Sequence, residues 1–320
     1  MKKRILVVED ETMIAKDIEN KLRNIGYESL PIVRSGEEAV KKAGKLRPDL
    51  ILMDIVLDGE MDGIDAAEQI RDYFNIPVVY LTAYADGVII ERAKVTEPFG
   101  YMIKPFGEKD LHSTIEMAIY KHKSTEKLLK SMESSINALA MALEVRDPYT
   151  AGHQRRVAEL VEAIALEMDR PINEVRGIHL TALIHDIGKI HIPAEILSKP
   201  GKLMDAEFDM IKIHPEAGYN ILKEIDFPWP IAETVYQHHE RLDGSGYPRG
   251  LKGKEILLQA KIIAVADVVE AMSSHRPYRA ALGTEKALKE IEDNKGILYD
   301  PDVADACLKV FREKGFKFSN

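Results

Sequence analysis

Three short apolar runs in the first third of the chain have the pattern of buried parallel strands. The runs occupy residues 5–8, 50–53 and 78–81, and longer stretches with helical spacing separate them. A strand covered by helices on both faces is apolar at every position instead of at alternate ones. The pattern predicts an α/β domain over residues 1–122, with a doubly wound, five-stranded parallel sheet of order 2-1-3-4-5.

Residues 107–145 have a different pattern, with intervals that alternate between four and three residues. No glycine follows Gly107 in this stretch, and proline is absent. The ten positions of the stripe, of which eight are apolar, are Leu111, Ile115, Ala118, His122, Thr125, Leu129, Met132, Ile136, Leu139 and Leu143. Two interpretations remain open. Either two amphipathic helices each pack on their own domain, or one long helix pairs in a homodimer and transmits a signal.

From about residue 136 the apolar positions have helical spacing throughout. We therefore expect residues 123–135 to form a helical linker and residues 136–320 to form an all-α domain. Loops are marked by glycine and proline, as in the segment 243–248.

Charge and composition argue against several classes of function. Residues 1–122 have 17 basic and 22 acidic side chains, and the remainder has 27 and 31. Neither portion is basic, which argues against DNA binding and against anionic membranes as partners. Cys307 is the only cysteine, the N-terminal apolar run is too short for a signal peptide, and no run is long enough for membrane insertion. We expect a cytoplasmic protein.

Acidic side chains follow two of the predicted strands. Glu9 and Asp10 come directly after the first strand and Asp54 after the third, and these strands are neighbours in the predicted order. Carboxylates that converge repel one another unless a cation joins them, and oxygen ligands of this kind suit Mg²⁺. Thr82 and Lys104 end the fourth and fifth strands, where they could hold a phosphoryl group on Asp54.

The helical domain concentrates imidazole and carboxylate groups. Half of the ten histidines and two aspartates form one constellation, comprising His153, His185, Asp186, His214, His238, His239 and Asp267. Asp186 and Asp267 interrupt apolar helical sequence, where a buried carboxylate needs a cation. Nitrogen and oxygen ligands together suit divalent transition metals. A set of this size indicates paired ions, which in turn suggest hydrolysis of a phosphate ester.

Residues 1–122 resemble a response-regulator receiver domain, on the segments 9–10, 52–54, 82–83 and 104–106. The resemblance implies that Asp54 is the phosphoacceptor and that Glu9, Asp10 and Asp54 hold Mg²⁺. Thr82 and Lys104 would contact the phosphoryl group, and Tyr101 would occupy the aromatic switch position. A sensor histidine kinase or phosphotransfer protein would be the partner. The bond from Lys104 to Pro105 is often cis in this family.

Residues 136–312 resemble the HD-GYP phosphohydrolases, on the segments 146–153, 185–190, 214–218, 238–248, 266–267 and 274–279. The resemblance implies hydrolysis of cyclic di-GMP to pGpG and leaves open a further step to GMP. The seven residues of the constellation would bind two metal ions, iron or manganese first, with Asp186 between them. A third ion in some members needs a glutamate where this chain has Tyr149.

The same resemblance assigns further residues to the reaction. Lys189, together with Asp186, would act in catalysis, because its ammonium group could offset negative charge on the phosphoryl oxygens. Gly246 and Tyr247 would shape the substrate site, and Arg276 and Arg279 could offer guanidinium groups to phosphate or guanine. Two rivals stay open: a hydrolase of another cyclic dinucleotide, and a catalytically inactive signalling adaptor.

Overall fold

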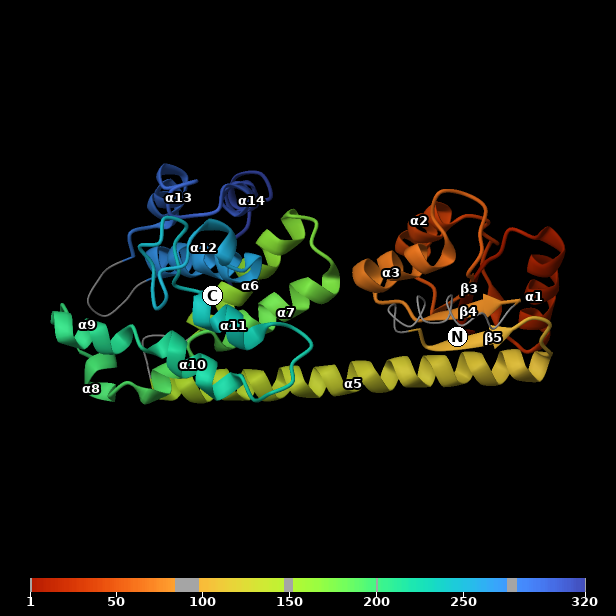
Figure 1. Ribbon diagram of the computed structural model, residues 1–320, viewed down its shortest axis with the longest axis horizontal. Coiled ribbons are helices and arrows are strands. Elements are labelled where there is room, and N and C mark those ends of the chain that lie inside the picture. Colours follow the sequence, from red (N-terminus) through yellow and green to blue (C-terminus); the bar gives the residue numbers. More distant parts are fainter. Residues whose placement is uncertain (1, 84–97, 147–151, 200, 275–280, 320) are drawn as a thin grey trace. The chain divides into compact units, whose positions relative to one another are not determined.

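The computed structural model describes residues 2–83, 98–146, 152–199, 201–274 and 281–319. The chain divides into two compact units, Met1–Ser131 and Met132–Asn320 (Figure 1). The first unit is an α/β sandwich and the second is helical. Each unit has its own hydrophobic core.

The first unit contains the predicted parallel sheet. Its strands pair in the order β2-β1-β3-β4-β5, and every pair is parallel. The strands are β1 (Arg4–Val8), β2 (Glu28–Ser29), β3 (Leu50–Asp54), β4 (Val78–Thr82) and β5 (Gly100–Ile103). All residues of β3 and β4 are buried, as expected for strands covered on both faces. The predicted fold class and strand order are therefore confirmed.

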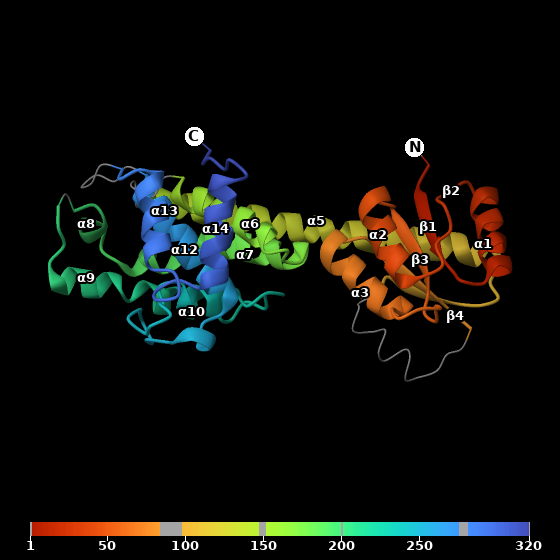
Figure 2. The same cartoon turned by 90° about the horizontal axis from the view of Figure 1, so that it is seen from above.

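Helices cover both faces of this sheet (Figure 2). Alternate residues of a strand point to opposite faces, so Leu6 and Val8 belong to one core cluster and Ile5 and Val7 to another. The first cluster includes residues of α2 (Gly36–Leu46) and α3 (Gly63–Phe74). The second includes residues of α1 (Thr12–Asn24) and the beginning of α5.

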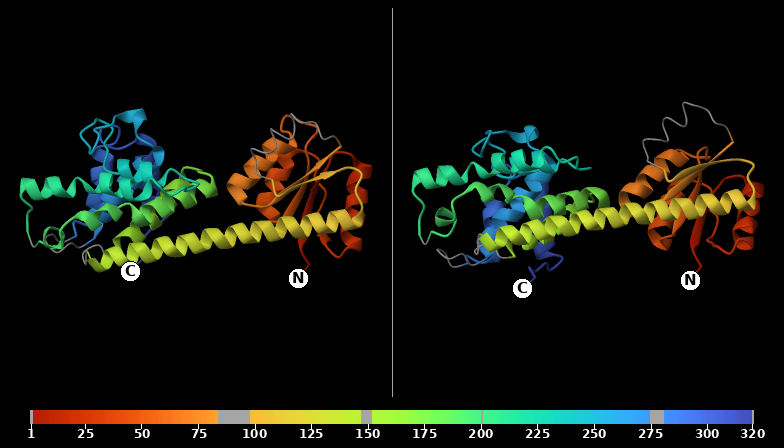
Figure 3. Two further views of the ribbon diagram at one scale, coloured as in Figure 1. Left: turned by 60° about the horizontal axis from the view of Figure 1, so that its bottom comes forward. Right: turned by 90° about the horizontal axis from the view of Figure 1, so that it is seen from below.

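The predicted linker lies within one continuous helix, α5 (Glu108–Arg146), which Figure 3 shows from two sides. Parts of its stripe nevertheless pack within each unit. Leu111, Ile115 and Ala118 are fully buried in the first unit, whereas Ile136 is 4% exposed in the core of the second. Each of the two interpretations is thus partly right: the helix is single, but the ends of its stripe pack on their own units.

The second unit is helical, as predicted. Four helices supply most of its core: α6 (His153–Glu167), α7 (Ile172–Ile184), α12 (Leu258–Ser273) and α14 (Pro301–Arg312). The other elements are η2 (Ile187–His191), α8 (Ala194–Leu197), α9 (Asp205–Ile211), α10 (His214–Leu222), α11 (Ile231–Gln237), η3 (Gly253–Glu255) and α13 (Thr284–Asp293). Among the described residues of the chain, no helix has the length and apolar character needed to span a bilayer.

Two neighbouring positions of α5 test this packing. Replacing Ile136, which is 4% exposed, by alanine should lower the free energy of unfolding of the second unit by ~2–5 kcal/mol, because a buried side chain is lost. The control Leu139→Ala, at a position 52% exposed, should change it by less than ~0.5 kcal/mol. The single tryptophan, Trp229, packs against the same core, so its fluorescence during urea unfolding reports this unit. Equal losses from both substitutions would contradict the packing.

Candidate metal centres

The strand ends of the first unit bring three carboxylates together. Glu9 follows β1 and Asp54 ends β3, and these strands are paired with Val8 opposite Met53. Glu9, Asp10 and Asp54 each offer an oxygen within 4.8 Å of the others. Glu9 is fully buried, and Asp54 is 8% exposed. Oxygen donors at this spacing suit Mg²⁺, as the sequence predicted.

Lys104 lies between two of these acids. Its Nζ atom is 2.6 Å from Glu9 Oε2 and 2.5 Å from Asp54 Oδ2. The backbone amide of Lys104 donates to the carbonyl of Thr82, so the two residues lie side by side at the ends of their strands. Burial raises the pKa of Glu9 to about 7; the Lys104 ammonium opposes this shift and the Asp54 carboxylate adds to it. A cation that displaces the Lys104 ammonium group from Glu9 would therefore bind a carboxyl group that loses its proton near neutral pH.

The other predicted switch residues lie on the same sheet. Thr82 is the last residue of β4 and is buried. Tyr101 lies in β5, and its ring centroid is 5.8 Å from that of Tyr80 on β4. The peptide bond from Lys104 to Pro105 is cis, as in the receiver family. Roles in phosphorylation and switching stay predictions for these residues.

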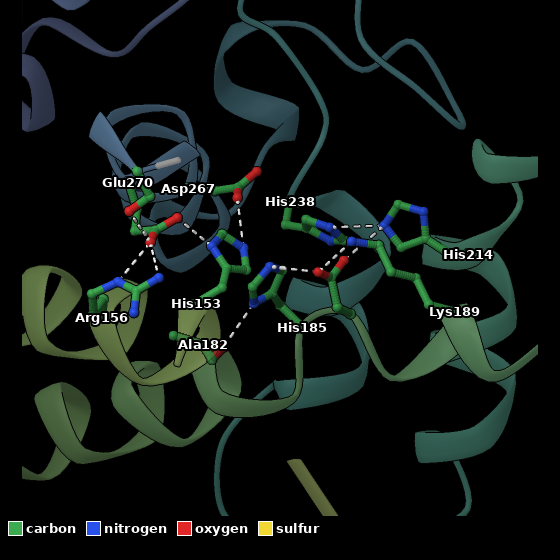
Figure 4. A network of polar contacts seen from close by, with 11 residues as sticks. His153, Arg156, Ala182, His185, Lys189, His214, His238, Asp267 and Glu270 are labelled. Atoms are coloured by element: carbon green, nitrogen blue, oxygen red, sulfur yellow. Dashed lines mark hydrogen bonds and ion pairs between the residues drawn. The ribbon is translucent and has the colours of Figure 1, made fainter. Parts of the chain in front are cut away.

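In the second unit, seven side chains form two adjoining groups of possible ligands. One group is Asp186, His214, His238 and His239, and the other is His153, His185 and Asp267. Within each group the ligand atoms lie within 4.8 Å of one another. The groups meet where the ring of His185 lies 5.1 Å from that of His238, centroid to centroid. Figure 4 labels His153, His185, His214, His238 and Asp267, whose side chains converge from separate segments of the chain. The structure thus brings together every residue of the predicted constellation.

Helix ends orient three of these histidines. In each, Nδ1 donates to the carbonyl three residues earlier, because a carbonyl can only accept. The pairs are His185 with Ala182 at 2.7 Å, His214 with Ile211 at 2.7 Å and His238 with Val235 at 2.6 Å. The last carbonyls of a helix have no partner within the helix, so this hydrogen bond satisfies them. It also leaves Nε2 of each ring as the atom available to a metal ion.

The protonation states suit metal binding. Burial lowers the pKa of His214 to about 4 and that of His238 to about 3, and it holds the pKa of His239 well below its usual range. Burial raises the pKa of Asp186, but the charges of Lys189 and His185 outweigh it, so the carboxylate is ionised. Neutral imidazoles and ionised carboxylates are the forms that ligate metals. These four donors, which form one of the two groups, therefore fit divalent transition metals.

Lys189 reaches the centre because two helical segments approach closely. Its Nζ atom is 2.6 Å from Asp186 Oδ2. Gly188, just before it, allows this approach: a Cβ atom there would lie 1.9 Å from the carbonyl oxygen of His214 and 2.5 Å from the amide nitrogen of Gly218. Only glycine permits η2 and α10 to lie this close.

The segment that contains Gly246 and Tyr247 lies beside the same centre. The Tyr247 ring is 4.7 Å from that of His239, centroid to centroid. A Cβ atom on Gly246 would lie 2.5 Å from Glu240 Cα, so the loop passes directly over its own start. Buried Glu240 accepts from the amides of Arg249 and Leu251, at 2.8 and 3.0 Å. Arg276, Arg279 and Tyr149 lie outside the described residues.

Sequence reasoning missed Glu270. Its Oε2 atom lies 2.5 Å from His153 Nδ1, while His153 Nε2 lies 3.2 Å from Asp267 Oδ1. Burial lowers the pKa of His153, but hydrogen bonds to the two carboxylates raise it to about 9. One signal was available: Glu270 follows Asp267 by three residues in an apolar helix, and residues at this spacing share a face.

Family models match both units. A response regulator receiver domain matches residues 5–116, and an HD domain matches residues 137–303. A cyclic di-GMP phosphodiesterase of Thermotoga maritima is 35% identical and aligns with 97% of this chain and 90% of its own length. The cyclic di-GMP phosphodiesterase response regulator RpfG of Xanthomonas campestris is 32% identical, over 95% of this chain and 87% of its own. A 3′3′-cGAMP-specific phosphodiesterase of Vibrio cholerae is 39% identical over 56% of this chain and 39% of its own.

The order of the two matches and the similarity along nearly the whole chain define a class of signalling protein. The chain belongs to the response regulators that join a receiver domain to an HD-type phosphohydrolase domain.

The raised pKa of Glu9 gives a pH-dependent prediction. Because Glu9 keeps its proton until about pH 7, Mg²⁺ binding at about pH 6 should release close to one proton from it, and at about pH 8.5 close to none. Mg²⁺ affinity of the receiver should rise over this range. Calorimetry in two buffers of different ionisation enthalpy measures the proton release.

Glu9→Gln should remove this proton release, and Glu11→Gln, which changes an exposed acid two residues later, should keep it. Undiminished proton release from the Glu9→Gln protein would sink the assignment.

Proposed function

We propose that this protein hydrolyses cyclic di-GMP to linear pGpG, and onward to GMP, with a centre of two divalent transition-metal ions, iron or manganese first. One observation carries the proposal: two adjoining groups of buried or half-buried imidazole and carboxylate ligands, one of which contains Asp186 beside Lys189. Two relatives that align with nearly all of this chain are named for cyclic di-GMP, which supports the choice of substrate.

Each ligand group would hold one ion. Asp186, His214, His238 and His239 would bind the first, and His153, His185 and Asp267 would bind the second. Asp186 also lies 3.5 Å from His185 Nε2, which is the geometry expected of a carboxylate between two ions. When bound, such a pair acts as a Lewis acid towards phosphoryl oxygens and supplies an activated water.

Other residues of the centre would act on the substrate directly. Lys189 places an ammonium group at the edge of the ligand groups, where it would stabilise negative charge on the phosphodiester. Tyr247 lies against His239 and would form one wall of the substrate site, while Gly246 would allow the loop to pass close to Glu240. Arg276 and Arg279 remain candidates for contacts to phosphate or guanine.

Another cyclic dinucleotide is the second candidate substrate. The similarity to a 3′3′-cGAMP-specific phosphodiesterase over 56% of this chain favours it specifically, because both substrates have the same phosphodiester linkage. The metal centre would be unchanged, and only the residues that contact the bases would differ. Turnover on a panel of cyclic dinucleotides separates the two candidates.

The first unit would regulate this reaction. A sensor histidine kinase or phosphotransfer protein would phosphorylate Asp54, with Mg²⁺ held by Glu9, Asp10 and Asp54 and with Lys104 and Thr82 contacting the phosphoryl group. A homodimer through α5 is part of this proposal. Since the buried residues of the predicted stripe pack within the units, the dimer would use the exposed side chains of α5, which include Met117, Tyr120 and Leu128.

The hydrolase is tested with full-length protein loaded anaerobically with Fe²⁺ or Mn²⁺. It should convert cyclic di-GMP to pGpG, and Asp186→Asn should lower the rate by more than ~100-fold, because residues that merely support ligands cost 10–100-fold. Asp209→Asn, at an exposed acid of α9, should leave the rate within about twofold. Chromatography of the nucleotides measures both. Metal-loaded protein that hydrolyses no cyclic dinucleotide would instead favour the signalling adaptor.

Phosphorylation is tested separately with an acyl phosphate. Asp54→Asn should abolish incorporation of phosphate and any response of hydrolysis to the phosphodonor, because the nucleophilic carboxylate is lost. Asp58→Asn, which changes an exposed acid four residues later, should behave as the unmodified protein. Phosphate-affinity electrophoresis measures the modified fraction. Full labelling of the Asp54→Asn protein would show that another residue accepts the phosphoryl group.

A further inference from the structure

His153 obtains its orientation differently from the candidate ligands His185, His214 and His238, whose Nδ1 atoms contact backbone carbonyls. It is the first residue of α6, so no earlier turn of that helix offers a carbonyl to Nδ1. A side chain takes this place instead: Oε2 of Glu270, on α12, lies 2.5 Å from Nδ1. Figure 4 shows the two side chains facing each other.

Glu270 is itself held by two other side chains. Its Oε1 atom accepts from Arg156 Nε at 2.7 Å and Nη2 at 2.6 Å, and from Ser274 Oγ at 2.7 Å. The residue is 1% exposed, and a buried carboxylate is stable only when it is paired and hydrogen-bonded. With one oxygen occupied by these donors, the other is directed at the imidazole.

We propose that Glu270 is a positioning residue of the metal centre: anchored by Arg156 and Ser274, it fixes the tautomer and ring orientation of His153 so that Nε2 is available, beside Asp267, to one of the two ions. The inference rests on the metal centre proposed above. A carboxylate that accepts from the second nitrogen of a ligand histidine orients the ring and raises its basicity.

The contact is specific to one ligand group. Glu270 meets His153, which belongs with His185 and Asp267. In the other group, His214 and His238 have their own anchors in the carbonyls of Ile211 and Val235. Loss of the Glu270 charge should therefore weaken one ion and spare the other, whereas a general disturbance of the fold would weaken both.

The decisive substitution is Glu270→Gln, which keeps the size of the side chain. If the amide nitrogen faces His153, Nδ1 must accept, and the proton moves to Nε2, the proposed ligand atom. If the amide oxygen faces His153, the NH₂ group faces the guanidinium of Arg156. Either arrangement loses a hydrogen bond that the carboxylate makes.

The experiment titrates metal-free, full-length protein with Mn²⁺ and follows the free ion by electron paramagnetic resonance. Wild-type protein should bind two ions in the second unit. Glu270→Gln should weaken one of them by ~10–100-fold and leave the other within about twofold. Ser274→Ala, which removes one anchor and keeps the carboxylate, should weaken the same ion by a smaller factor.

Glu167→Gln is the matched control. Glu167 ends α6, its side chain is 6% exposed, and it pairs with Lys309 and Lys314 away from the ligand groups. It should lose an ion pair without any change in Mn²⁺ affinity. Unchanged affinities in Glu270→Gln, or equal weakening of both ions, would overturn the proposal. Because the readout is ion affinity, the result decides the role of Glu270 whichever nucleotide the enzyme hydrolyses.

Discussion

The second unit depends on keeping a group of ionisable side chains away from water. His185, Asp186 and His238 are at most 2% exposed, and such groups are costly to bury unless each has a partner. Here the partners are one another, together with Lys189 and the carbonyls at helix ends. The helices are arranged so that their ends, where backbone groups lack partners, meet at this one place. Stability and ligand geometry are therefore set by the same contacts.

This arrangement explains the importance of residues that are neither candidate ligands nor candidate catalytic groups. Gly188 and Gly218 matter because two backbones approach closely beside His214. Glu240 matters because it holds the amides of the loop that follows His239. In both cases a residue outside the ligand groups determines where a candidate ligand or a candidate substrate-site residue lies.

The sequence was sufficient to predict the sheet and the convergence of the candidate ligands. These ligands were recognisable because they interrupt otherwise apolar segments. Asp54 and Glu9 stand at strand ends, and Asp267 lies in an apolar helix, so their exceptional positions were visible. Glu270 was not found, since one glutamate near the end of a helix has many ordinary explanations. Its role depends on a contact with a helix more than a hundred residues away, and local spacing carries no information about such contacts.

The helix α5 posed a different problem. A stripe with alternating intervals of four and three residues is the same whether a helix packs on its own domain or on a second helix. The structure shows that the two ends of the stripe pack within the cores of the two units, through Leu111 and Ile115 at one end and Ile136 at the other. The sequence pattern by itself does not show this.

Between these two anchored ends, α5 has no core of its own. From Tyr120 to Ser135 no residue is buried, and Thr125 directs its hydroxyl back to the carbonyl of Lys121, a contact that often bends helices. A helical stretch that buries so little surface depends mainly on its own backbone hydrogen bonds and is only marginally stable in water. Local melting of this middle stretch should consequently require less free energy than loss of either core, so its amide protons should exchange with solvent while both units remain folded.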